Sequence, residues 1–175
     1  SLVQGITEFI PVSSSSHLII ISEYLKFSEA DLTIDISLHI GSFIAVITYF
    51  RKDLSDYIKN KDLFLKIIVS SIPIMIVGYL LVKSEIINQL RNLEVIGWTT
   101  IIFGIFLFIS DKFEIKKSIE KDFSLKSAIV IGIFQILSLI PGVSRSGITI
   151  SSSRLLNFSR YDSAKISFLL SMPTL

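Results

Sequence analysis

The chain has 175 residues, of which 50% are hydrophobic, 18% are charged and none is cysteine. The charged fraction lies below the ~25% of an average soluble domain. Together with a mean hydropathy of +0.67, it favours an integral membrane protein that lies in a lipid bilayer. The absence of cysteine excludes disulfides, thiolate metal ligands and a thiol nucleophile. The net charge of +2 gives no indication of a nucleic-acid partner, and we expect none.

Long uncharged runs bounded by charged residues predict membrane-crossing helices. We expect these helices near residues 34–50, 67–82, 95–110 and 127–140, with loops at 51–66, 83–94 and 111–126. Several runs are shorter than the ~20 residues that cross a bilayer, so we expect some helices to be interrupted or to turn back. Lys and Arg gather in the loops 51–66 and 111–126. By the positive-inside rule these two loops are cytoplasmic, and the loop 83–94 lies outside.

The first polar cluster is EFIPVSSSSH, residues 8–17. If a helix begins after Pro11, Ser13 and Ser14 share a face with His17. A hydroxyl beside an imidazole is the minimal activated nucleophile, and Glu8 would orient the histidine, bind a divalent cation or act as an acid. The alternative is that the serines only cap the new helix.

The second polar cluster is PGVSRSGIT, residues 141–149. Its Arg145 is accompanied by three hydroxyl-bearing residues, which are Ser144, Ser146 and Thr149. A guanidinium fork among hydroxyl donors is suited to phosphate oxygens. The alternative is that Arg145 is only a salt-bridge partner of Glu8.

The two clusters belong to an internal repeat. Residues 5–10 (GITEFI) resemble residues 132–137 (GIFQIL), and both segments are followed by proline and Ser-x-Ser. Both copies end on Phe-Ser-x-x-Asp, at 27–31 and 158–162. The repeat predicts that the two clusters form equivalent structures.

An odd number of crossings between the copies gives them opposite orientations. We therefore predict an all-α integral membrane protein in which residues 1–175 form one polytopic domain. Repeat 1 would comprise about 1–50 and repeat 2 about 128–175, in inverted topology with re-entrant, discontinuous helices. Such repeats place helix N-termini at their interface, which predicts a site for an anionic ligand in the outer half of the membrane.

A second histidine, His39, lies on the expected helix 34–50. We interpret it as an interhelical hydrogen-bonding residue, with Gly41 permitting close helix packing.

Both clusters closely resemble the two signature motifs of the bacterial undecaprenyl-diphosphate phosphatases, also called the bacitracin-resistance proteins. The resemblance extends to LHIGS at 38–42 and to NFSRY at 157–161. It implies an enzyme of the bacterial inner membrane with interlocked inverted repeats and an active site toward the periplasm. Such an enzyme removes the terminal phosphate of a C55 isoprenyl diphosphate, which recycles the lipid carrier of cell-wall synthesis.

The resemblance also implies roles for individual residues and a divalent cation, Mg²⁺ or Ca²⁺. Catalysis falls on Glu8, Ser14, His17 and Arg145, substrate binding on Ser13, Ser144, Ser146 and Thr149, and metal binding on Gln4 and Glu8. Many members have Glu where this chain has Gln4, so the metal site has one expected carboxylate. Many also have Gly where Ser16 precedes the histidine.

Other interpretations remain open from the sequence. Inverted repeats with broken helices are also the plan of secondary transporters, so a lipid-phosphate flippase or anion carrier is the alternative function. A third interpretation, a purely structural membrane scaffold, would give Arg145 and the adjoining hydroxyls no function. A homodimer is compatible with the sequence. Because the chain starts with Ser1 and stops after Met172-Pro173, we expect it to be a piece of a longer protein.

Overall fold

The computed structural model describes residues 7–8, 10–14, 16–17, 32–49, 51–84 and 92–174. Its helices are α3 (Leu32–Tyr49), α4 (Arg51–Lys59), α5 (Lys61–Lys83), α7 (Leu93–Asp111), α8 (Ile119–Asp122), α9 (Leu125–Gln135), the 3-10 helix η1 (Ile136–Leu139), α10 (Arg145–Leu155) and α11 (Arg160–Thr174). Within these ranges the only β interaction is an isolated bridge between Lys117 and Phe158. The prediction of an all-α chain is confirmed for the described residues.

Two of the described helices, α5 and α7, are long and apolar enough to cross a membrane. They contain 23 and 19 residues, and only 22% and 11% of their apolar windows is buried inside the protein. A core helix of a soluble protein would be mostly buried. These exposed apolar surfaces are instead suited to lipid, as a membrane protein requires.

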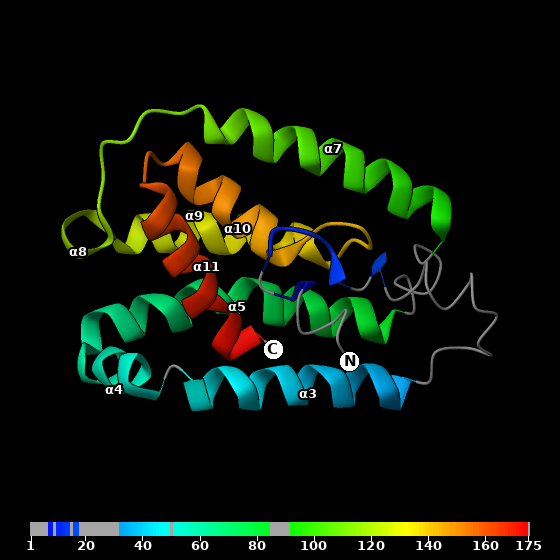
Figure 1. Ribbon diagram of the computed structural model, residues 1–175, viewed down its shortest axis with the longest axis horizontal. Helices are drawn as coiled ribbons and strands as arrows, with labels where there is room; N and C mark the ends of the chain where they lie inside the picture. Colours follow the sequence, from blue (N-terminus) through cyan, green and yellow to red (C-terminus); the bar gives the residue numbers. More distant parts are fainter. Residues whose placement is uncertain are drawn as a thin grey trace.

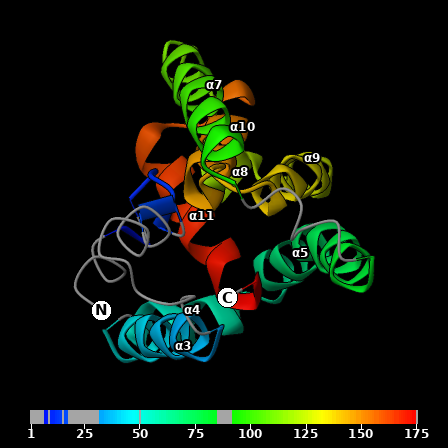
Figure 2. The same ribbon diagram turned by 90° about the vertical axis from the view of Figure 1, so that its right-hand side faces the viewer.

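The helices form layers that can be followed in Figures 1 and 2. In Figure 2, α7 lies at one end of the molecule with α10 beside it, and α3 and α4 lie at the other end. Helix α11 runs between these ends, where it contacts α10 and α5. Helix α5 in turn packs along α9.

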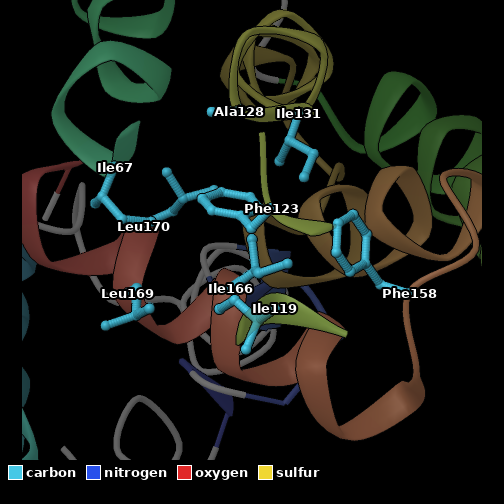
Figure 3. Packing of buried hydrophobic residues seen from close by; sticks show 9 residues of the cluster. All are labelled: Ile67, Ile119, Phe123, Ala128, Ile131, Phe158, Ile166, Leu169 and Leu170. Atoms are coloured by element: carbon cyan, nitrogen blue, oxygen red, sulfur yellow. The ribbon is translucent and has the colours of Figure 1, made fainter. Parts of the chain in front are cut away.

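The apolar core joins α5, α9 and α11 with the segment around α8 (Figure 3). Its members are Ile67, Ile119, Phe123, Ala128, Ile131, Phe158, Ile166, Leu169 and Leu170. Phe123 and Phe158 meet edge to face with ring centroids 6.1 Å apart. This core holds α11 in place beside α10, the helix that begins in the second polar cluster.

The structure corrects three expectations about helix boundaries. The expected loop 111–126 contains α8 and the first residues of α9. The expected loop 51–66 contains α4 and the first turn of α5, because Asn60 ends one helix and caps the next through a 3.2 Å bond from the Leu63 N–H. The expected helix 127–140 is α-helical only to Gln135 and continues as the 3-10 helix η1. Pro141, which has no N–H and restricts the preceding residue, follows directly.

The Phe-Ser-x-x-Asp marker of the second repeat begins a helix. Asn157 has a φ of 70°, and the Ser159 hydroxyl both accepts from the Asp162 N–H (3.0 Å) and donates to its carboxylate (2.8 Å). This reciprocal cap starts α11. The first marker, at 27–31, lies outside the described residues.

The corner between α10 and α11 is fixed by Arg154, whose exposure is 2%. Its guanidinium donates to the carbonyls of Asp111 (2.9 Å), Phe113 and Phe158. One buried side chain therefore ties the end of α7 to the end of α10.

Candidate functional site

The two polar clusters meet in space, although 136 positions separate the residues that join them. The Ser146 hydroxyl on α10 donates to the Ile10 carbonyl at 2.8 Å. The first turn of α10 therefore lies directly against the first cluster, as the sequence predicted.

Helix α10 starts where the chain has turned sharply at Pro141-Gly142. Gly142 has a φ of 93°, and a Cβ there would lie 2.0 Å from the Thr99 hydroxyl oxygen, so only glycine fits. The Ser144 hydroxyl accepts from the Gly147 N–H at 3.2 Å and lies 3.1 Å from the Ser146 hydroxyl. Ser144 therefore caps α10, and in the first cluster Ser13 plays the same part, since its Oγ accepts from the Ser16 N–H at 3.3 Å. The capping interpretation of the serines holds for these two residues.

Glu8 and Arg145 form a buried ion pair. Arg145 Nη2 donates to Glu8 Oε1 at 2.7 Å. The Arg145 side chain is 19% exposed and the Glu8 side chain is 4% exposed. Arg145 Nη1 points to the Thr174 hydroxyl at 3.4 Å. The salt-bridge alternative for Arg145 is thus present in the structure, and each charge offsets the desolvation of the other.

The second carboxylate oxygen of Glu8 lies close to two further side chains, Ser14 and His39. Ser14 Oγ donates to Glu8 Oε2 at 2.9 Å, and His39 Nε2 lies 3.6 Å from the same oxygen. The interpretation of His39 as an interhelical hydrogen-bonding residue did not identify Glu8 as its neighbour. The expected close packing at Gly41 is not found among the described residues, because a Cβ there would meet none of their atoms within 4 Å. The signal was the high cost of an imidazole that faces lipid, which requires it to face a polar partner or water instead.

His17 is turned away from this carboxylate. Its Nδ1 lies 2.7 Å from the Ser13 carbonyl oxygen, and the side chain is exposed. Among the described contacts, the hydrogen bond of the Ser14 hydroxyl goes to Glu8 and not to His17. The expected nucleophile and the expected base are therefore not paired in this structure.

Like Ser144 and Ser146, the other two predicted substrate-binding residues, Ser13 and Thr149, have internal hydrogen-bond partners. The buried Ser13 Oγ accepts from the Ser16 hydroxyl at 2.7 Å. Thr149 is 1% exposed, and its hydroxyl lies 2.7 Å from that of Ser167. Thr149 thus joins α10 to α11.

A polar cavity of about 230 Å³, called the polar cavity below, opens beside the ion pair. Its polar lining includes Glu8, Ser13, Ser14, His39, Ser144, Arg145 and Thr174. A second cavity of about 390 Å³ also touches Glu8 and Arg145, and Tyr57 and Lys165 line its far part. The ion pair is therefore reached from two cavities.

The described residues offer few protein ligands for a metal ion. No group of three His, Cys, Asp or Glu side chains comes together among them, and the predicted ligand Gln4 lies outside the described residues. Mg²⁺ often takes one or two carboxylates and completes its shell with water and substrate phosphates. Glu8 fits a cation of that kind, which a phosphorylated ligand would help to hold.

The site can present three groups to one bound anion: the Ser14 hydroxyl, the Glu8 carboxylate as proton acceptor and the Arg145 guanidinium as a positive charge. Ser14 and Arg145 both contact Glu8 and both line the polar cavity. An anion in this cavity would compete with Glu8 for the guanidinium. These are the components that phosphoryl transfer requires, namely positioning and charge neutralisation.

Comparisons with known proteins agree with this chemistry. A family model described as "Bacitracin resistance protein BacA" matches residues 1–175. An undecaprenyl-diphosphatase of Pelagibacter ubique is 49% identical over 176 residues, which cover 100% of this chain and 69% of the relative. An undecaprenyl-diphosphatase of Saccharophagus degradans is 42% identical over 99% of this chain and 69% of the relative. One of Dinoroseobacter shibae is 38% identical over 100% of this chain and 70% of the relative.

Proposed function

We propose, since this chain belongs to the bacitracin resistance protein BacA family, that it is an undecaprenyl-diphosphatase. It would hydrolyse the C55 isoprenyl diphosphate to the monophosphate and inorganic phosphate, which returns the lipid carrier to cell-wall synthesis and confers resistance to bacitracin. The observation that carries the proposal is the convergence of Ser14 and Arg145 on Glu8 at the polar cavity.

In the proposed reaction the diphosphate enters the polar cavity and draws Arg145 from Glu8. The Ser14 oxygen attacks the terminal phosphorus while its proton passes to Glu8, the acceptor 2.9 Å away. The bond from that phosphorus to the bridging oxygen breaks, and the lipid monophosphate leaves. Water then attacks the phosphoserine while protonated Glu8 returns its proton to the departing serine oxygen. Dihydrogen phosphate is released, and the serine hydroxyl and the Glu8 carboxylate are restored.

Charge neutralisation supplies much of the proposed rate enhancement. The guanidinium fork of Arg145 binds phosphate oxygens in two directions, which an ammonium cannot reproduce. A Mg²⁺ or Ca²⁺ ion held by Glu8 and the phosphates, with Gln4 as a further proposed ligand, would neutralise additional negative charge. His39, beside Glu8, is positioned to hydrogen-bond the carboxylate.

The membrane arrangement belongs to the same proposal. We place the protein in the bacterial inner membrane as a multi-pass protein with interlocked inverted repeats and its site toward the periplasm. The helix break between η1 and α10 and the contact between the two clusters support discontinuous repeat helices. The homodimer stays a prediction.

A second candidate function is transport of a lipid phosphate. It is favoured by one observation, which is that Glu8 and Arg145 line two different cavities. A carrier exposes its binding groups to two sides in turn. A carrier does not need a nucleophile, whereas the phosphatase does.

Phosphate release in detergent separates the two functions, because a detergent micelle has no second compartment. The full-length protein would be incubated with C55 or C15 isoprenyl diphosphate and Mg²⁺ or Ca²⁺, and inorganic phosphate would be measured. We expect release that EDTA suppresses and added cation restores. If neither lipid yields phosphate with either metal, the phosphatase proposal is wrong and the transport function takes its place.

A further inference from the structure

A larger, mostly apolar hollow adjoins the polar cavity. It has a volume of about 520 Å³ and lies between α7, α10 and the first cluster. Val12, Ser13 and Ser144 line both hollows. We call this hollow the α7 groove. A polar compartment that holds Arg145 therefore shares a wall with an apolar one.

The wall formed by α7 has room for a ligand. Gly97 and Gly104 are seven residues apart, so they share a face of the helix, and both line the α7 groove. A Cβ at either position would meet no atom of the described residues within 4 Å. Apolar side chains of the same helix, including Ile96 and Leu107, complete this wall.

The same helix is held firmly elsewhere, so the groove is not a consequence of loose packing. The Thr99 hydroxyl donates to the Pro141 carbonyl at 2.7 Å, and Gly142 leaves no space for a Cβ against α7. Helix α7 is thus anchored at the turn before α10 and stands clear of the protein along its two glycines.

We propose that the α7 groove binds the first isoprene units of the lipid chain while the diphosphate occupies the polar cavity. This inference rests on the proposed function, because it assigns the tail of the same substrate. The order of compartments matches the order of groups in the molecule, with phosphate at Arg145 and hydrocarbon along α7. Since only 11% of the apolar window of α7 is buried, the rest of the chain can continue into the bilayer.

His17 belongs to the lipid end of the proposed site. It lines the α7 groove and is not part of the lining of the polar cavity. Its exposed imidazole therefore lies beside the lipid end of the site, at the first turn after Pro11.

The test is the dependence of binding on tail length. Non-cleavable methylenediphosphonate analogues with C5 and C15 isoprenyl tails would be titrated calorimetrically into the full-length protein in detergent. The variants are Gly104→Trp, which fills the groove, and Ile105→Trp, a matched change at a neighbouring side chain that is 55% exposed and lies outside the groove lining. Gly97→Trp provides a second groove-filling variant.

We expect the wild type and Ile105→Trp to bind the C15 analogue at least about tenfold more tightly than the C5 analogue, because burial of hydrocarbon favours the longer tail. Both glycine variants should lose most of this difference, because the C15 analogue loses the contacts of all its isoprene units in the groove, whereas the C5 analogue loses those of one unit only. An unchanged C15-to-C5 ratio in folded Gly104→Trp and Gly97→Trp, or an equal loss for both analogues, would overturn the proposal. Absence of such a ratio in the wild type would do the same.

Hydrolysis of the parent diphosphates, measured on the same samples, reports separately on the proposed function. Tail-dependent binding without phosphate release would contradict the phosphatase and leave the α7 groove as a lipid site. Phosphate release without tail-dependent binding would contradict the groove alone.

Discussion

Glu8 is the residue at which the candidate site is assembled. One of its carboxylate oxygens accepts from Arg145 at 2.7 Å, and the other accepts from Ser14 at 2.9 Å and faces His39 at 3.6 Å. A buried carboxylate with these partners is held in a single orientation. The proton acceptor for Ser14 is therefore already in place before substrate binds.

The contrast between Ser14 and His17 gives a prediction at this scale. Ser14→Ala should lower kcat by a factor of about 10³ or more, because it removes the attacking oxygen. His17→Ala should cost about tenfold or less in kcat, because the imidazole contacts neither Ser14 nor Glu8 in the structure. Single-turnover phosphate release by the full-length protein measures both. Equal, severe losses in the two variants would restore His17 as the base.

The resemblance to a known family, carried by the two polar clusters, is confirmed, and the ion pair between Arg145 and Glu8 was among the sequence-based alternatives. The partner of the Ser14 hydroxyl was not predicted. Helical spacing placed Ser14 on the face of His17. In the structure the Ser14 side chain instead satisfies Glu8, a partner six positions away across the bend at Pro11. Spacing rules describe neighbours within one helix, so they do not identify a partner such as Glu8 that lies on the other side of the break at Pro11. The same limitation hid the approach of His39 to Glu8.

At the scale of elements, the apolar runs predicted where helices lie but not where they begin and end. Long uncharged apolar runs identified α5 and α7, and the structure shows that most of their apolar surface is exposed. The polar segment after α3 forms α4, because the pattern RKDLSDYIK is amphipathic and Asn60 separates it from α5. A count of basic residues assigns a side of the membrane, but it does not distinguish a loop from a short interfacial helix.

The contact between α5 and α9 gives a prediction at the scale of elements. A Cβ on Gly132 would lie 2.2 Å from the Ser70 carbonyl oxygen, so Gly132→Ala must move one helix and should cost about 1–3 kcal/mol of stability. Gly41→Ala is the matched control, since a Cβ there meets nothing within 4 Å, and it should be neutral or stabilising by about 0.5–1 kcal/mol. Thermal unfolding in detergent compares the two. A Gly132→Ala protein as stable as the wild type would show that α5 and α9 pack less tightly than described.

At the scale of the whole molecule, two distant parts of the chain supply complementary halves of one site. The first cluster brings the carboxylate and the hydroxyl, and α10 brings the guanidinium. Arg154 and the apolar core hold α10 and α11 together without contacting the polar cavity. The structural Arg154 and the candidate-site Arg145 thus lie at opposite ends of the same helix.

The central claim is that Arg145 binds the diphosphate, and one measurement tests it most directly. Phosphate release from C15 isoprenyl diphosphate would be compared among full-length wild type, Arg145→Ala, Arg145→Lys and Arg160→Ala, the last a control whose side chain is 72% exposed. We predict losses in kcat/KM of about 10³ for both Arg145 variants, because lysine lacks the fork, and less than about twofold for the control. Near-normal turnover by folded Arg145→Lys would contradict the claim and leave Arg145 as only the salt-bridge partner of Glu8.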